Sequence, residues 1–259
     1  MGRTTESQYA GSDSGAVLSP DLRGQVALVT GAGRGIGRAI ALALGAAGAH
    51  VIVAARSAAQ LADVAATIAG VGGQASAIPV DISQEESVEA LFRQIRKRFG
   101  RLDVLIANAA VILAGELVNF PVDDFDALMA INLRGTFLCC QQAMKIMVPQ
   151  HSGYIIALAS VASFKTYRSQ TAYAATKHGL LGMVKGLALE SQEHGIRVSA
   201  ILPGGVDTDM GRAARPDLDT TVLLQPDDIA RTVLFLLSLS DQAAIDQIYI
   251  RRRASQPFP

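Results

Sequence analysis

A tyrosine and a lysine stand four residues apart in the stretch Tyr173-Ala174-Ala175-Thr176-Lys177. At this spacing both side chains lie on one face of a helix. The pKa of a free tyrosine is about 10, and a lysine ammonium about 5 Å away would favour the phenolate and lower that pKa. The pair indicates an acid–base group that works near neutral pH, although Tyr-x-x-x-Lys alone is a common chance pattern.

Two further polar residues could complete a catalytic site. Ser160 follows a short apolar run over residues 154–158, so we expect it at the carboxyl end of a strand, where ligands of open α/β sheets bind. Asn132 lies in a long helical pattern before this run. Each has a structural alternative, since serine is a frequent helix N-cap and the asparagine could fill a turn or a kink.

A glycine-rich turn follows the first apolar run of the chain, and a helical pattern begins at its end. Glycines permit a tight turn and a close approach of the backbone to a pyrophosphate, which the free N–H groups of a helix N-terminus attract. The alternative is a glycine-rich turn without a ligand. The motif predicts a dinucleotide-binding loop formed by Gly31, Gly33, Arg34, Gly35, Ile36 and Gly37.

Charges after the next two apolar runs favour NADP(H) over NAD(H). An NAD site usually has an acid about 20 residues after the glycines, but no Asp or Glu occurs between positions 21 and 63. Arg34 and Arg56 can reach the same corner, where a guanidinium suits a 2′-phosphate; either could also be a solvated surface charge. Asp81 is placed to bind an adenine amine, or to cap a helix, and Ile82 beside it is assigned to the cofactor site.

Composition excludes several classes of function. Lys+Arg and Asp+Glu each number 23 in 259 residues, so the basic excess of a nucleic-acid binder is missing. No apolar run reaches ~18 residues, so we expect no membrane-spanning helix and no membrane partner. Cys139 and Cys140 are adjacent, so they cannot form a disulfide that joins distant parts of the fold. This favours a reducing compartment such as the cytoplasm. We expect no metal site.

Short apolar runs alternate with helical patterns along the chain, and each run is continuous, as in strands buried on both faces. This alternation predicts an α/β fold: a Rossmann-like doubly wound, seven-stranded parallel sheet with helices on both faces. Residues 1–22 are expected to be a flexible arm, 23–250 one catalytic domain, and 251–259 a polar tail. The predicted strands are 25–30, 50–54, 75–80, 103–107, 153–158, 196–201 and 247–250, and the predicted helices are 36–47, 57–69, 84–99, 124–148, 171–193 and 226–239.

Over residues 24–250 the chain resembles the short-chain dehydrogenase/reductase family. The resemblance is carried by the glycine motif, by Asn108-Ala109, by Asn132, Ser160, Tyr173 and Lys177, and by the run Pro203-Gly204-Gly205-Val206-Asp207-Thr208. The family's usual Asn-Asn-Ala-Gly is Ala107-Asn108-Ala109-Ala110 here, and its frequent Gly-Gly turn after the last strand is replaced by Arg251-Arg252-Arg253. The first departure slightly lowers the expectation for cofactor binding, and the second lowers the expectation for the usual C-terminal subunit contacts.

The resemblance implies a role for each matching residue. Tyr173 would exchange a proton with the substrate oxygen, and Ser160 would hydrogen-bond that oxygen. Lys177 would hold the nicotinamide ribose, and Asn132 would anchor a water in a proton relay. The remaining cofactor-binding residues would be Asn108, Pro203, Gly204, Val206 and Thr208, with helix capping as an alternative for Thr208.

The family implies reduction of a carbonyl compound or oxidation of its alcohol. Lys165, Arg168, Arg212 and Arg215 could meet an anionic group of the substrate, or could be solvated rim charges. We expect NADP(H)-dependent reduction of a ketone, with a 3-oxoacyl thioester or small β-keto acid favoured. The alternatives are a sugar or polyol ketone dehydrogenase using NAD(H), and a non-catalytic NADP(H)-sensing or scaffold protein.

Two neighbouring helical patterns, 124–148 and 171–193, carry more apolar residues than packing on one sheet face requires. An isologous contact between copies would bury this surplus. We therefore expect a homo-oligomer, a tetramer or a dimer. The alternative is that these residues only fill the core under the sheet.

Overall fold

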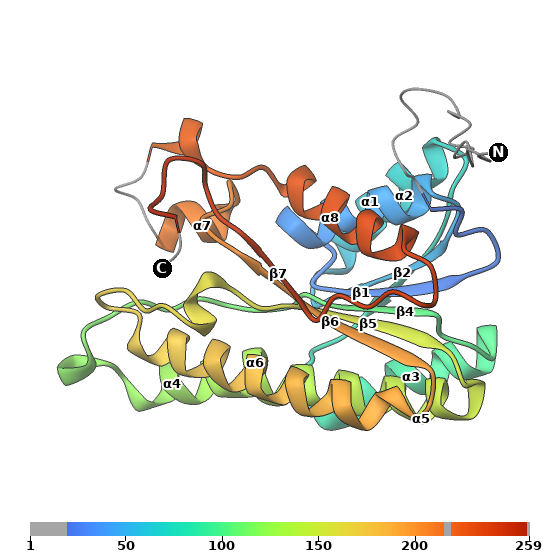
Figure 1. Ribbon diagram of the computed structural model, residues 1–259, viewed down its shortest axis with the longest axis horizontal. Helices are drawn as coiled ribbons and strands as arrows, with labels where there is room; N and C mark the ends of the chain where they lie inside the picture. Colours follow the sequence, from blue (N-terminus) through green and yellow to red (C-terminus); the bar gives the residue numbers. More distant parts are fainter. Residues whose placement is uncertain (1–19, 215–218, 258–259) are drawn as a thin grey trace, which may run out of the picture.

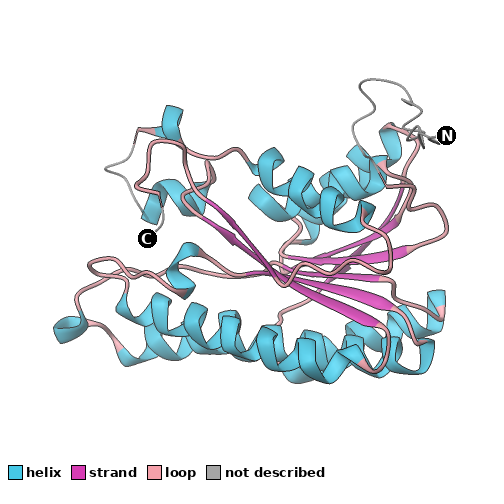
Figure 2. Cartoon of the chain, viewed as in Figure 1, coloured by secondary structure: helices cyan, strands magenta, loops and turns pink. Residues whose placement is uncertain are grey.

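In the part of the chain that the structure describes, residues 20–214 and 219–257, seven parallel strands form the centre of this computed structural model. Figures 1 and 2 show the sheet between two layers of helices. The strands pair in the order β3-β2-β1-β4-β5-β6-β7, which confirms the predicted Rossmann-like sheet. Their bounds are β1 (Val26–Thr30), β2 (His50–Ala55), β3 (Gln74–Pro79), β4 (Val104–Ala107), β5 (Gly153–Leu158), β6 (Ile196–Pro203) and β7 (Gln247–Ile250).

Helices cover both faces of the sheet, each over its own hydrophobic core. One layer is formed by α1 (Gly35–Ala46), α2 (Ala58–Gly70) and α8 (Pro226–Ser238), and the other by α3 (Glu85–Phe99), α5 (Thr136–Gln150) and α6 (Thr171–Gln192), as Figure 1 shows. Two shorter helices, α4 (Val122–Leu128) and α7 (Asp209–Ala214), lie in the segments that follow β4 and β6. The short α7 is not among the helices predicted from the sequence.

Burial of the strands agrees with the predicted pattern in the interior of the sheet and differs at its edges. All five residues of β1 and all four of β4 are buried. The edge strands β3 and β7 instead alternate between more and less exposed positions. An edge strand has a neighbour on one side only and is less completely covered by helices, so the expectation of continuous burial was wrong for these two strands.

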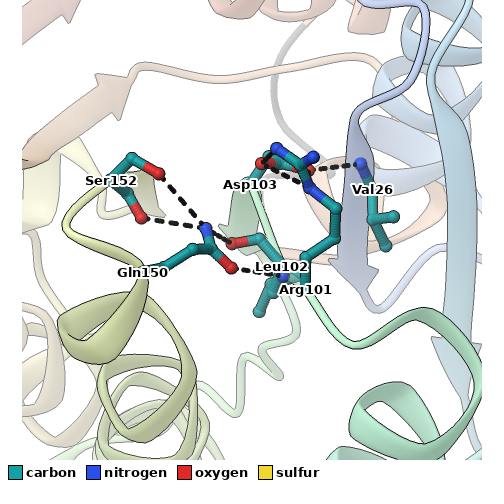
Figure 3. A network of polar contacts seen from close by, with 6 residues as sticks. All are labelled: Val26, Arg101, Leu102, Asp103, Gln150 and Ser152. Atoms are coloured by element: carbon teal, nitrogen blue, oxygen red, sulfur yellow. Dashed lines mark hydrogen bonds and ion pairs between the residues drawn. The ribbon is translucent and has the colours of Figure 1, made fainter.

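Polar side chains fasten the amino end of β4 to its surroundings (Figure 3). The Asp103 carboxylate accepts a hydrogen bond of 2.7 Å from the backbone N–H of Val26 and is paired with Arg101. The Gln150 side chain, at the end of α5, accepts from Leu102 N–H and donates to the Leu102 carbonyl. These contacts align β1, β4 and α5 at the amino-terminal end of the strands.

The predicted helix 124–148 is interrupted. The chain forms α4, then a π-helical segment over Met129–Gly135, and then α5. Periodicity could not reveal this, because a π-helical turn adds one residue without changing the apolar character of the helix. Such widened turns are frequent at functional sites, and this one contains Asn132.

The predicted arm, residues 1–22, lies mostly outside the described residues, which begin at Pro20. Leu22 is buried in the core, and its N–H donates to the Ala47 carbonyl. No helix in the described ranges is long and apolar enough to cross a membrane. Both cysteines, Cys139 and Cys140, are free thiols buried in α5.

Candidate active site

A cavity of about 530 Å³ lies at the carboxyl-terminal end of the parallel strands. This volume is in the usual range for a small-molecule site. It brings together most of the site residues expected from the sequence. These are Gly31, Gly33, Arg34, Gly35, Ile36, Gly37, Arg56, Asp81, Ile82, Asn108, Ser160, Tyr173, Lys177, Pro203, Gly204, Val206 and Thr208.

The glycine loop is packed tightly against the segment after β4. A Cβ on Gly37 would overlap the Gly31 carbonyl oxygen and lie 2.5 Å from Asn108 Nδ2, while Gly31 has a φ of +67°. The Asn108 amide donates to the carbonyls of Thr30 and Gly31. A side chain on either glycine would push this loop away from its neighbour, so the close backbone approach that a dinucleotide needs is built into the packing.

Thr30 connects the same two segments. Its hydroxyl accepts hydrogen bonds from the N–H groups of Asn108 and Ala109 and donates to the Ile106 carbonyl. Ala110, which replaces the glycine usual in the family, also lines the cavity. The departure therefore leaves the segment in place beside the glycine loop.

Asn132 is fully buried in the π-helical segment and is not one of the residues that line the cavity. Its side chain accepts from Val111 N–H at 2.8 Å and donates to the Val111 carbonyl at 2.9 Å. It also donates to Thr176 Oγ1 in α6 at 3.2 Å. The amide thus joins the segment after β4 to the helix that carries Tyr173 and Lys177. This agrees with the structural alternative for Asn132, and its anchoring of a water in a proton relay stays a prediction.

Ser160 and Tyr173 meet in the cavity. Ser160 directly precedes a 3₁₀ turn, Val161–Ser163, and its hydroxyl accepts from Ala162 N–H at 3.1 Å. The N-cap alternative is therefore correct, and the residue still lines the cavity. Burial raises the pKa of Tyr173 to about 12, and its hydrogen bond with the Ser160 side chain acts in the opposite direction.

Lys177 is almost completely buried, and its Nζ donates to the Leu158 carbonyl at 2.9 Å. Burial lowers its pKa to about 8, so most molecules still carry the ammonium at neutral pH. Nζ lies 5.9 Å from the centre of the Tyr173 ring. The expected lowering of the Tyr173 pKa by Lys177 is not met in this structure, because the loss of water around the phenol raises that pKa more than the hydrogen bond with Ser160 lowers it.

The two arginines expected at the 2′-phosphate corner differ in their surroundings. Arg34 lies 3.9 Å from Asp209 across the cavity mouth, in an exposed pair that contributes little. Arg56 is exposed and has no ion-pair partner among the described residues. Asp81 Oδ1 accepts hydrogen bonds from the N–H and the hydroxyl of Ser83. These bonds shape the turn before α3, but Asp81 is not the N-cap of that helix.

The segment after β6 closes another side of the cavity. Thr208 Oγ1 accepts from Gly211 N–H at 3.0 Å, so the capping alternative for this residue is correct. A Cβ on Gly35 would lie 3.1 Å from the Thr208 methyl group. Because its hydroxyl is used as a cap and its methyl group faces the glycine loop, Thr208 links α7 to that loop.

Two of the four charges expected to meet an anionic substrate are neutralised by acids. Arg168 pairs with Glu116, and Arg212 pairs with Asp207 and Asp209. Lys165 lies over the Tyr167 ring at 5.8 Å. Arg215 is outside the described residues.

Several residues of the cavity were not predicted from the sequence, above all Tyr249, Arg251, Arg252 and Ser255. They belong to β7 and the segment after it, which was expected to be only a polar tail. The sequence could have predicted their position, because the segment after a parallel seventh strand must begin at the same end of the sheet as the segments after the other six.

Among the described residues, no three His, Cys, Asp or Glu side chains gather as a metal site would require. The residues that are present fit a dinucleotide, since the glycine loop leaves no room for a Cβ and the cavity follows the ends of the strands.

Comparison with known proteins agrees with this geometry. A family model described as short chain dehydrogenase matches residues 25–219. An uncharacterised oxidoreductase of Staphylococcus aureus is 35% identical over 89% of this chain and 98% of its own length. A 3-oxoacyl-[acyl-carrier-protein] reductase of Synechocystis sp. is 39% identical over 83% of this chain and 90% of its own. The crystal structure of a metagenomic short-chain oxidoreductase in complex with NADP is 35% identical, with a TM-score of 0.81 over 91% of this chain and all of that one.

We predict that Gly37→Ala damages the glycine loop. The added methyl group would displace Gly31 or Asn108, so the free energy of unfolding should fall by about 1–3 kcal/mol and the Kd for NADPH should rise roughly tenfold or more. Urea denaturation and fluorescence titration measure the two effects. Gly70→Ala is the control, since a Cβ there meets nothing within 4 Å. Unchanged NADPH affinity in Gly37→Ala would show that the loop does not hold the cofactor.

Proposed function

The chain belongs to the short-chain dehydrogenase/reductase family of NAD(P)-dependent oxidoreductases, and on this basis we propose that it uses NADPH to reduce a ketone to a secondary alcohol. The observation that carries the proposal is the meeting of Ser160, Tyr173 and Lys177 with the glycine loop in one cavity. A protein that only bound the dinucleotide would need the glycine loop but no acid–base pair beside it.

The residues of the chain supply orientation and the proton. A bound nicotinamide cofactor supplies the hydride. Tyr173 stays protonated at neutral pH, because burial holds its pKa near 12, and it can therefore donate its phenolic proton to the oxygen of the reduced carbonyl. An alkoxide is a stronger base than a phenolate, so this transfer is favourable. Ser160, which hydrogen-bonds with Tyr173, orients the same oxygen.

Lys177 and Asn132 position the groups that take part in this step. The Lys177 ammonium is fixed by the Leu158 carbonyl, which leaves its remaining protons for the ribose of the cofactor. Asn132 holds the backbone at Val111 and the Thr176 side chain. Because Thr176 is next to Lys177 in α6, we assign Asn132 the role of a positioning residue.

The preference for NADPH is supported by charge. Arg56 follows β2 and lines the cavity without a carboxylate partner among the described side chains. The missing acid after β2 removes the group that usually binds a ribose 2′-hydroxyl. The similar metagenomic oxidoreductase was crystallised with NADP, which agrees with this preference.

The favoured substrate is a 3-oxoacyl thioester or a small β-keto acid. Support comes from the similarity to a protein named 3-oxoacyl-[acyl-carrier-protein] reductase. The apolar walls of the cavity include Met210, Leu223 and Tyr249, which suit a short acyl chain.

We further infer that the protein is a homo-oligomer that buries a groove beside α6. The groove is lined by Asp126, Met129, Ala130, Leu133, Arg134, Phe137, Gly179 and Met183. Phe137 is 48% exposed, an unfavourable position for a phenyl ring in a monomer. A second copy placed by a two-fold axis would cover the ring and brace the helix that carries Tyr173 and Lys177.

Tyr173→Phe tests the proton donor. The substitution removes only the hydroxyl, so folding and NADPH binding should persist while kcat falls about 100-fold or more. Absorbance loss of NADPH over a panel of ketones measures the rate, and fluorescence titration checks the binding. Near-normal turnover would exclude Tyr173 from the mechanism.

Exchange of the cofactor preference tests the 2′-phosphate corner. Combining Arg56→Ala with Ala55→Asp removes a cation and adds a carboxylate, so kcat/KM should fall with NADPH and rise with NADH. Arg93→Ala, on the exposed face of α3 where Arg93 pairs with Glu89, is the control. A wild-type protein that already has the higher kcat/KM with NADH contradicts the proposal.

Phe137→Asp tests the assembly. Light scattering at micromolar concentration should give a mass of two or four chains of 27.1 kDa for the wild type and a smaller assembly for the variant. Val71→Asp, at an exposed residue after α2, should leave the mass unchanged. A wild-type mass of one chain would rule out the homo-oligomer.

A further inference from the structure

We propose that Arg252, in the segment after β7, binds the carboxylate of a β-keto acid and makes the enzyme selective for anionic substrates. This inference rests on the proposed function and assigns a residue to substrate recognition. The segment after β7 differs in composition from the Gly-Gly turn usual in the family.

β7 delivers the segment to the cavity. The pairing of β7 with β6 places Ile250 opposite Pro203, and Gly204 N–H donates to the Ile250 carbonyl at 2.7 Å. Figure 1 shows β7 leading to the same end of the molecule as α7. The stem of Arg252 packs over Gly205, where its Cδ lies 3.4 Å from the position of a Cβ. Arg252 is therefore held next to the segment that lines the cavity after β6.

Hydrogen bonds give the segment a fixed shape. Arg251 Nη1 donates to the carbonyls of Arg252, Arg253 and Ser255. The N–H and the hydroxyl of Ser255 both donate to the Arg252 carbonyl. Arg251 is thus used to close the turn, and the Arg252 side chain is presented from a formed loop that costs little entropy on binding.

The charge of Arg252 is uncompensated. It is half-buried and lines the cavity, yet no carboxylate among residues 20–214 and 219–257 pairs with it. The nearby Arg212 already has two acidic partners. A half-buried guanidinium without a counter-charge attracts an anion more strongly than a solvated one does.

Arg252 is poorly placed for the 2′-phosphate. Arg56 follows β2, and four strands, β1, β4, β5 and β6, lie between β2 and β7 in the sheet. Arg252 is instead on the side of Ser160, since Tyr249 of β7 packs edge-on against Phe164, at a ring distance of 5.1 Å, just beyond the Ser160 turn. We therefore assign the anion it meets to the substrate rather than to the 2′-phosphate of the cofactor.

A carboxylate fits this position best. The planar guanidinium can donate two parallel hydrogen bonds to it. In a β-keto acid, one carbon separates the carbonyl from the carboxylate, so a short molecule can present both groups. Reduction then adds hydride from NADPH to the carbonyl carbon and the Tyr173 proton to its oxygen, giving a β-hydroxy acid and NADP⁺, while the carboxylate is unchanged.

Acetoacetate and its methyl ester form a matched pair of substrates that differ in this charge. For Arg252→Gln, the KM for acetoacetate should rise about 10- to 100-fold, the effect of losing charge-assisted hydrogen bonds, whereas kcat/KM for the ester should change less than about twofold. Arg252→Lys should retain part of the selectivity. Arg253→Gln is the control, since Arg253 is exposed and should behave as the wild type.

Equal losses with acid and ester would overturn the assignment, and so would a higher KM for NADPH with an unchanged ratio between the two substrates. If the wild type reduces ketones but Arg252→Gln keeps its selectivity, the proposed function stands and this inference fails. If the wild type reduces neither compound, the proposed function fails for this substrate class. Calorimetric binding of 3-hydroxybutyrate to wild type and Arg252→Gln then decides, and equal affinity rejects the inference.

Discussion

The parallel alignment of the strands is the constraint on which the site depends. Because every strand runs in the same direction, the segments that follow the strands all begin at the same end of the sheet. The glycine loop after β1, Arg56 after β2, Ser160 after β5, Pro203 at the end of β6 and Arg252 after β7 come together for this reason. The contacts of Asp103 and Gln150 hold the opposite end, so the strand ends cannot slide relative to one another.

Buried polar groups then set the positions of the loops that follow the strands. Thr30 and Asn108 tie the glycine loop to the segment after β4. Asn132 ties that segment to α6, and Lys177 ties α6 to the end of β5. A buried amide or ammonium without hydrogen-bond partners destabilises the folded protein by about 1–3 kcal/mol or more. Each of these residues therefore restricts its neighbours to one arrangement. The π-helical turn is part of this network, because it contains Asn132.

Charge is distributed unevenly along the cavity. Arg34, Arg168 and Arg212 are paired with acids, and Arg251 donates to backbone carbonyls. Arg56 and Arg252, at strands far apart in the sheet, remain without acidic partners among the described residues. The two positions correspond to the two anionic groups that we assign, the 2′-phosphate of the cofactor and the carboxylate of the substrate. A zero net charge conceals this arrangement, since composition counts only totals.

The sequence by itself determined the order of the elements, the parallel sheet, the glycine loop and the Tyr173–Lys177 pair, because these follow from local periodicity and from short spacings. It could not determine the π-helical turn at Asn132, the direction of the Tyr173 pKa, or the partners of Arg168 and Arg212. It also missed Arg252 as part of the cavity. Each of these depends on groups far apart in the chain that meet only after the sheet has formed. Burial and ion pairing are properties of the packed molecule, and the tertiary structure alone decides them.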